Sequence, residues 1–173
     1  MKIVTLLGSV QAGTNTGKAL KVVEDHMRQQ GAQVERIDPA VLDLNLPGQE
    51  ETADAKKIQE LVKDADGIVL STPEYHGSYS AALKLIIENL SYPSLLADKP
   101  VVMLGVAAGA LGATKAIEHL RSMTAHLGCF TLPKAVSVAN AYRVFDKEGN
   151  CTDEDLTQRL QALGESLVKF SKN

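Results

Sequence analysis

Short apolar runs alternate with longer segments of helical periodicity along this chain, and that alternation constrains the fold more than any other feature. Apolar strands are expected at residues 2–7, 34–37, 67–71 and 100–106, with a fifth strand within 129–139. Repeated strand-helix-strand units of this kind are typical of a parallel sheet with helices on its faces. The sequence therefore predicts an α/β protein built on a five-stranded parallel sheet.

The segments between these strands have the marks of amphipathic helices. Ile58, Leu61 and Val62 give one of them an apolar stripe, and Gly31 and Gly128 stand where glycine often follows the end of a helix. The predicted helices span residues 16–30, 52–64, 80–89, 113–127 and, after a cap at 152–155, the segment to about 170.

Composition limits the class of protein. The chain has 173 residues, 45% of them hydrophobic, which fits one domain over residues 1–173. Its net charge of −3 and the lack of a basic cluster beyond Lys56-Lys57 argue against nucleic acid and membrane partners. No apolar run approaches the ~18 residues of a membrane span, and residues 1–8 resemble a strand rather than a signal peptide, so a cytoplasmic location is expected.

The two cysteines predict neither a disulfide nor a metal site. Cys129 and Cys151 lie far apart, with no CxxC pattern and no companion histidine cluster. They are interpreted as ordinary reduced thiols.

Five strands joined by helices leave two common strand orders, the flavodoxin-like order 2-1-3-4-5 and half of a dinucleotide-binding fold. Both orders place ligands beyond the carboxyl ends of the first, third and fourth strands. Three loops should therefore determine function, at residues 8–16, 72–79 and 105–113.

The first loop, residues 8–16, has the composition of a phosphate site. It is rich in hydroxyl groups and leads into a helix amino terminus, where free amides and the helix dipole favour an anion. Gly8 and Gly13 have the spacing of a nucleotide P-loop, but Thr14 stands where that motif requires lysine, and GxGxxG is absent. A terminal monophosphate is the remaining ligand, and a helix cap without a ligand is the alternative.

The second loop, residues 72–79, could hold a flat ring such as an isoalloxazine. Tyr75 and His76 offer ring contacts, and Gly77 permits close backbone approach. Glu74 could be a general base or a structural anchor, and His76 could be a proton donor or simply solvated. A rigid strand-to-helix connection without a ligand remains open.

The third loop, residues 105–113, contains three glycines and four alanines after a buried strand. Small residues of this kind allow the backbone to approach a flat ring or leave room for a second planar molecule. Tight packing of helix on sheet is the other interpretation.

Together these segments resemble the NADPH-dependent FMN reductase family, whose members include quinone, azo-dye and chromate reductases. The resemblance spans nearly the whole chain and implies a flavodoxin-like three-layer sandwich with strand order 2-1-3-4-5. It rests on Gly8-Ser9 with Thr14-Asn15, on Pro73-Glu74-Tyr75-His76-Gly77-Ser78, on Gly109-Ala110-Leu111-Gly112 followed by Ala116 and Leu120, and on Phe145–Gly149 with Asp153-Glu154.

The resemblance implies an FMN site without a metal and without an obligatory catalytic side chain, His76 being the weak candidate. The residues implied to bind FMN are Ser9, Gln11, Thr14, Asn15, Thr16, Pro73, Glu74, Tyr75, His76, Gly77, Ser78, Ala107, Gly109 and Gly112.

Two positions depart from the family pattern. Gln11 stands where the family usually carries arginine, which removes a charge-assisted bond to the FMN phosphate of typically ~1.5–3 kcal/mol. His76 replaces asparagine, which affects the side-chain contact of the second loop and the substrate preference.

The function implied is hydride transfer from NADPH or NADH through FMN to a quinone-like or other small acceptor, in a ping-pong scheme. A homodimer or homotetramer is expected, because Leu83, Leu85, Ile86, Ile87 and Leu90 offer more apolar surface than one sheet contact needs. The alternative is a flavodoxin-type electron carrier without nicotinamide turnover, and a third hypothesis is a binding module that has lost flavin. Lys18, Lys84 and Lys115 lie near the loops, but the sequence does not place them well enough to choose NADPH over NADH.

Overall fold

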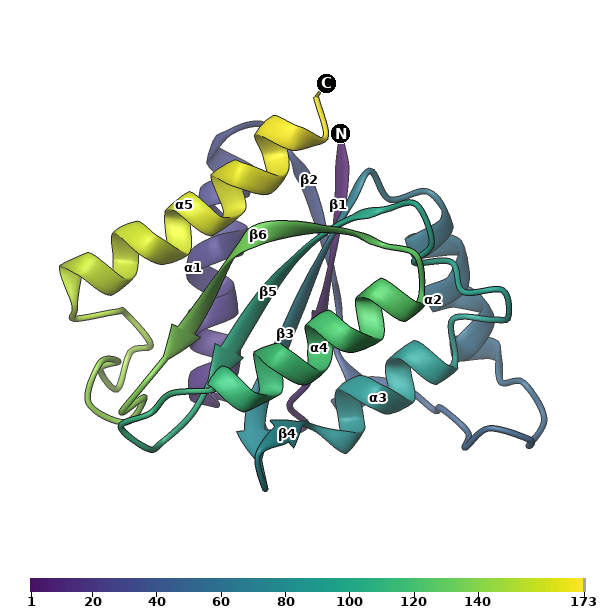
Figure 1. The fold of residues 1–173 in the computed structure, drawn as a ribbon, viewed down its shortest axis with the longest axis horizontal. Coiled ribbons are helices and arrows are strands. Elements are labelled where there is room, and N and C mark those ends of the chain that lie inside the picture. The colour runs from purple at the N-terminus through teal and green to yellow at the C-terminus, as the bar shows by residue number, and fades with distance from the viewer. Residues whose placement is uncertain (173) are drawn as a thin grey trace.

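The computed structural model describes residues 1–172 and shows a parallel sheet covered by helices on both faces (Figure 1). Its main strands run in the order β2-β1-β3-β5-β6, and all of these pairs are parallel. Counting parallel strands alone, this is the predicted order 2-1-3-4-5. The strands are β1 (Lys2–Leu7), β2 (Gln33–Ile37), β3 (Gly67–Tyr75), β4 (Ser78–Tyr79), β5 (Pro100–Val106) and β6 (Phe130–Val138).

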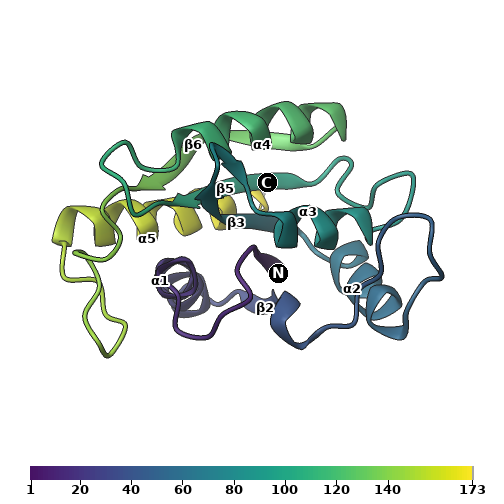
Figure 2. The same ribbon diagram turned by 90° about the horizontal axis from the view of Figure 1, so that it is seen from below.

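The helices form two layers. Helices α1 and α5 cover one face of the sheet, and α2, α3 and α4 cover the other (Figure 2). The helices are α1 (Asn15–Gln29), α2 (Ala53–Lys63), α3 (Ala81–Glu88), α4 (Thr114–His126) and α5 (Glu154–Phe170), with a short 3-10 turn, η1, at Pro39–Val41. Within residues 1–172, none of the helices combines the length and the apolar character needed to cross a bilayer.

Local sequence explains where most helices begin. The side chains of Thr14, Thr52, Ser80 and Asp153 each accept a hydrogen bond from a backbone amide in the first turn of the helix that follows. Serine, threonine and aspartate are favoured at this position because the helix leaves its first amides without internal partners. Helix α4 differs, since Ala113 at its start offers no side-chain oxygen.

The sheet divides the core into two clusters. Successive strand residues point to opposite faces, so Val69 packs under α1 and α5 while Leu70 packs under α2, α3 and α4. Residues 68–72 of β3 are fully buried, which fits the central position of this strand. The near-continuous apolar character of β3 and β5 follows from this burial on both faces.

The third strand is longer than predicted, and the expected loop at 72–79 is a β-hairpin. Strand β3 continues to Tyr75 and turns back into β4, with Glu74 paired to Tyr79 and Tyr75 to Ser78. The two turn residues, His76 and Gly77, have φ values of 51° and 73°. Positive φ at both central residues is the geometry of a two-residue hairpin turn, in which Asn-Gly is the favoured pair.

The apolar face of α3 does not support the predicted oligomer. Leu83, Ile86, Ile87 and Leu90 are already buried in the core of this chain, and Leu85 is half-buried. The argument from this face was wrong because helical periodicity cannot tell whether neighbouring elements of the same chain cover both sides of a short helix.

Candidate active site

A cavity of about 460 Å³ opens at the carboxyl edge of the sheet, where the three predicted loops meet. Residues from the loop after β1 form one end, and the ends of β3 and β5 form the other. Its volume lies within the roughly 300–1,000 Å³ typical of small-molecule sites. The lining residues are Ser9, Gly13, Thr14, Asn15, Thr16, Pro73, Glu74, Tyr75, Val106, Ala107, Ala108 and Ala141.

The loop after β1 presents free hydrogen-bond donors to this cavity. Among residues 1–172, no acceptor is found for the backbone amides of residues 9–16. Ser9 and Thr16 are 5% and 3% exposed, so their hydroxyl groups lie within the protein surface. The loop has the donors that an anion site requires, because it combines unpartnered amides, hydroxyl groups and the positive end of the α1 dipole.

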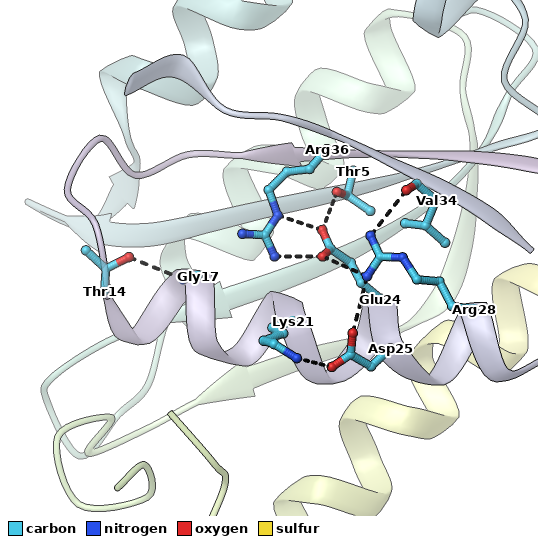
Figure 3. Close-up of polar contacts among 9 residues, drawn as sticks. All are labelled: Thr5, Thr14, Gly17, Lys21, Glu24, Asp25, Arg28, Val34 and Arg36. Atoms are coloured by element: carbon cyan, nitrogen blue, oxygen red, sulfur yellow. Dashed lines mark hydrogen bonds and ion pairs between the residues drawn. The ribbon is translucent and has the colours of Figure 1, made fainter. Parts of the chain in front are cut away.

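Helix α1, which carries this loop, is fixed to the sheet by a buried carboxylate (Figure 3). Glu24 is 2% exposed and accepts a 2.6 Å hydrogen bond from Thr5 of β1. Arg36 of β2 donates to both carboxylate oxygens of Glu24, at 2.8 and 2.7 Å. These hydrogen bonds raise the pKa of Arg36 above its ordinary value. The forked contact joins α1, β1 and β2 and so holds the loop in place.

The hairpin between β3 and β4 is attached to helix α4 by Glu74. Its Oε2 accepts a 2.9 Å hydrogen bond from the amide of Ala116, in the first turn of the helix that lacks a cap of its own. The ring of His119 adds a 2.9 Å contact to Ser78 on the same hairpin. Of the two roles weighed for Glu74, the geometry supports the structural anchor.

Replacing Glu74 by alanine is expected to lower the free energy of unfolding by about 1 kcal/mol, because the first turn of α4 loses the one side-chain acceptor that residues 1–172 provide for its amides. Urea denaturation would measure this change. The matched control is Glu118→Ala, which removes a carboxylate from the exposed side of α4, where the ion-pair partner of Glu118 is Lys115. Surface pairs of this kind contribute little, so equal losses in the two variants would contradict the assignment.

The third loop is held against the chain that follows β6. Ala107 donates to Val138 at 2.9 Å, and the amide of Ala141 donates back to Ala107 at 3.1 Å. The amide of Asn140 donates to Gly109 at 3.1 Å. These backbone contacts place Ala107 and Ala141 side by side in the cavity wall, where neither side chain projects far into the space.

The structure brings together more than half of the residues predicted to bind a cofactor. Eight of them line the cavity: Ser9, Thr14, Asn15, Thr16, Pro73, Glu74, Tyr75 and Ala107. Six do not: Gln11, His76, Gly77, Ser78, Gly109 and Gly112. His76, Gly77 and Ser78 form the tip of the hairpin beyond Tyr75, where His76 is exposed and the other two are half-buried.

Gln11 faces a different hollow from the one expected. It lines a neighbouring cavity of about 300 Å³, together with Lys18 and Arg36, on the far side of Gly13 and Thr14. Gly13 and Thr14 line both cavities, so the loop at 8–16 forms a wall between them.

Four lining residues were not predicted. Gly13, Val106 and Ala108 lie within the expected loops, but they were not named individually as binding residues. Ala141 lies in a segment expected only to be a loop, and it reaches the site through backbone contacts with Ala107. Backbone contacts of this kind leave no mark in a single sequence.

Burial of Cys129 keeps its thiol protonated. Burial raises its pKa to about 11, so almost no thiolate is present at neutral pH. Cys129 follows α4 and pairs with no other sulfur, since both cysteines are free. It does not line the cavity at the sheet edge.

The cavity fits a flavin mononucleotide. The amides of residues 9–16 and the hydroxyl groups of Ser9 and Thr16 can hold the phosphate at one end. At the other end, Pro73, Tyr75 and the small residues 106–108 provide a narrow wall suited to a flat ring. The donor-rich end and the apolar end thus match the two halves of FMN.

Comparison with known proteins agrees with this site. Residues 1–143 match the family model of NADPH-dependent FMN reductases. An NADPH azoreductase of Bacillus sp. (strain OY1-2) is 35% identical over 152 residues, which cover 86% of this chain and 82% of that protein. An FMN-dependent NADPH-azoreductase of Staphylococcus aureus is 26% identical over 183 residues, covering 100% and 96%.

A solved structure extends the similarity to the fold. The flavoenzyme NAD(P)H:(acceptor) oxidoreductase of Paracoccus denitrificans superposes with a TM-score of 0.83 at 20% sequence identity, over 99% of this chain and 97% of that one. Because the family model spans most of the sequence and includes all three loops of the site, the chain belongs to the NADPH-dependent FMN reductase family, enzymes that use FMN and NAD(P)H.

Proposed function

We propose that this enzyme passes two electrons from NADPH or NADH, through FMN in the cavity at the sheet edge, to a small planar acceptor such as a quinone or an azo compound. The main observation behind the proposal is that one cavity is lined both by the loop at residues 9–16, which has free backbone amides, and by the apolar residues 106–108. When bound, FMN would supply the hydride chemistry: it would accept a hydride from nicotinamide and return two electrons to the acceptor, and water would supply the protons that the reduced acceptor takes up.

The side chains of the chain bind and position rather than react. Glu74 accepts a hydrogen bond from the amino terminus of α4 through Oε2, which supports a positioning role. The hydroxyl group of Thr14 accepts from Gly17 at 3.2 Å and holds the first turn of α1, which fixes the amides of the phosphate loop. Small residues at 106–108 leave space above a ring, which suits acceptors of varied shape.

Nicotinamide and acceptor are proposed to occupy the same space in turn. A cavity of about 460 Å³ lies in the lower half of the range of small-molecule sites, so it offers little room for a second planar molecule beside the flavin and the nicotinamide. Initial rates measured with varied NADPH at several fixed concentrations of a quinone, and then of an azo dye, test this scheme. Parallel double-reciprocal lines are expected, and lines that intersect would contradict it.

The protein is further proposed to be a homodimer or homotetramer and to lie in the cytoplasm. Tyr92 and Leu111 are 98% and 87% exposed, unusual values for large apolar side chains. Two free thiols, Cys129 and Cys151, suit a reducing compartment. Light scattering during gel filtration would show the dimer or tetramer, and a monomer at micromolar concentration would exclude both.

Replacing His76 by asparagine is expected to keep kcat within about threefold and to leave stability equal or slightly higher. His76 is an exposed turn residue with positive φ, a position for which asparagine is better suited, and it does not line the cavity. Steady-state rates and thermal melting would measure both effects. A loss of kcat greater than tenfold at unchanged stability would restore His76 as a proton donor.

A further inference from the structure

Arg143 lies two residues after Ala141, which lines the cavity, and it differs from the other arginines of the chain. The sequence contains five arginines, and the guanidinium groups of the other four bond to a carboxylate or a backbone carbonyl. Among residues 1–172, the guanidinium of Arg143 has neither kind of partner. Its one neighbour of note is the ring of Tyr142, with the guanidinium carbon 5.3 Å from the ring centroid.

The backbone brings Arg143 close to the site. Ala141 lines the cavity and is 2% exposed, and two residues of chain can separate its Cα from that of Arg143 by no more than about 7 Å. The amide of Arg143 donates to Asn140 at 2.8 Å, which closes a tight turn over residues 140–143. The amides of Asn140 and Ala141 in this turn donate hydrogen bonds to the carbonyl groups of Gly109 and Ala107 in the third loop. The base of the Arg143 side chain is therefore fixed relative to the cavity wall.

Tyr142 orients the guanidinium without neutralising it. The ring is 59% exposed, so the stacked pair lies on the surface and keeps its N–H donors in solvent. Stacking on an aromatic face restricts the side chain while leaving the planar fork of donors free, and such a fork matches the oxygens of a phosphate group.

Three lysines close to the predicted loops are already engaged. Lys84 pairs with Glu88 and Lys115 with Glu118, each on its own helix. The ammonium of Lys18 donates to the backbone carbonyl of Asp146 at 2.8 Å. Among the arginines of residues 1–172, Arg143 is the one whose guanidinium donors are free to bind a phosphate.

We propose that Arg143 binds the 2′-phosphate of NADPH and thereby makes the enzyme prefer NADPH to NADH. This inference rests on the proposed function, in which the nicotinamide end of the same nucleotide enters the cavity. The adenosine end then extends past Ala141 to the turn at 140–143, where the guanidinium forms charge-assisted hydrogen bonds to the phosphate monoester.

The test compares kcat/KM of the FMN-loaded wild type and of Arg143→Gln with NADPH and with NADH as the electron donor. The variant is expected to lose roughly 10- to 100-fold in kcat/KM for NADPH, mainly through KM, and less than about threefold for NADH. Arg143→Lys should recover part of the loss because it keeps the charge without the fork. Arg159→Gln is the matched control, an arginine on α5 that contacts Asp155 and the carbonyl of Ser137.

A binding measurement separates this proposal from the proposed function. Calorimetry with adenosine 2′,5′-bisphosphate and with AMP should show at least about tenfold tighter binding of the bisphosphate to the wild type, a preference that Arg143→Gln abolishes. Equal losses for NADPH and NADH, or a bisphosphate preference that survives in Arg143→Gln, would overturn the assignment. A protein that binds the bisphosphate through Arg143 but shows no flavin reduction would instead overturn only the proposed function.

Discussion

Replacing Glu24 by alanine is expected to lower the free energy of unfolding by about 2–4 kcal/mol, because the change leaves the Arg36 guanidinium and the Thr5 hydroxyl without their partner. Removing one member of a buried ion pair typically costs ~3–5 kcal/mol, and the value here is lower because Arg36 is 29% exposed and can regain some water. Chemical denaturation without added flavin would measure the change.

Two further variants identify the cause of that loss. Glu35→Ala removes an exposed carboxylate from the residue next to Arg36 on β2 and is expected to change stability by less than about 0.5 kcal/mol. Combining Glu24→Ala with Arg36→Ala should cost less than the sum of the two single changes, because each alone already removes the pair. Glu24→Ala with stability within about 0.5 kcal/mol of wild type would show that the forked contact does not hold α1 to the sheet.

Replacing Gly8 by alanine is expected to disturb both folding and FMN binding. A Cβ at this position would lie 2.8 Å from the carbonyl oxygen of Ser71 and 2.9 Å from the hydroxyl oxygen of Ser80. The backbone cannot easily move away, because Gly8 donates to Ser71 at 2.7 Å and accepts from Ser80 at 2.6 Å. Overpacking of this kind costs about 1–3 kcal/mol, and we expect the upper end of that range.

The same displacement would shift the amides that follow Gly8, so we also expect FMN affinity to fall at least about tenfold, or ~1.4 kcal/mol. Gly17→Ala is the matched control in the same segment, since its Cβ would lie 3.5 Å from the Thr14 hydroxyl oxygen, an ordinary contact. Alanine suits this helical position, so a gain of ~0.5–1 kcal/mol is expected. Fluorescence titration of FMN would compare the variants, and wild-type affinity in Gly8→Ala would refute the role of this junction.

The sequence was sufficient for the five parallel strands and for the cap of the last helix. Apolar runs such as residues 100–106 are buried on both faces, so the pattern that marks a strand and the packing that stabilises it coincide. The cap predicted at residues 152–155 is Asp153 in the structure, and it could be predicted because capping is a local interaction.

The hairpin after β3 was missed because its signals are unusual. Proline inside a run argues against a strand, yet Pro73 lies two residues past Ser71, the last β3 residue that pairs with β1, where one edge of the strand is free. The turn itself contains His76 in place of the more familiar asparagine before Gly77. Because of Pro73 in the strand and His76 in the turn, the sequence pattern did not indicate a regular two-residue turn.

The boundary of the last strand was uncertain for a related reason. The pairing of β6 with β5 is irregular between Thr131 and Ala135: Val101 pairs with Thr131 and Met103 with Ala135, so residues 132–134 of β6 lie opposite Val102 alone. Pro133 and Lys134 interrupt the alternation of side chains there, so no simple period marks the strand.

The candidate site was predicted where it depends on local chemistry and missed where it depends on long-range contacts. The hydroxyl-rich loop at 8–16 and the end of β3 were recognised from residue types alone. The position of Gln11 in the neighbouring cavity and the contribution of Ala141 follow from the paths of loops in space. The anchoring of Glu74 to Ala116 joins residues 42 positions apart, which no local pattern reveals.

The measurement that tests the central claim most directly is the visible absorbance of the purified protein during titration with FMN, followed by anaerobic addition of NADPH. The flavin band is expected to shift as the cavity fills and then to bleach with one NADPH per flavin. Binding without bleaching by NADPH or NADH would indicate an electron carrier and contradict the proposed hydride transfer. A spectrum that FMN leaves unchanged, even at high concentration, would contradict the assignment of the cavity itself.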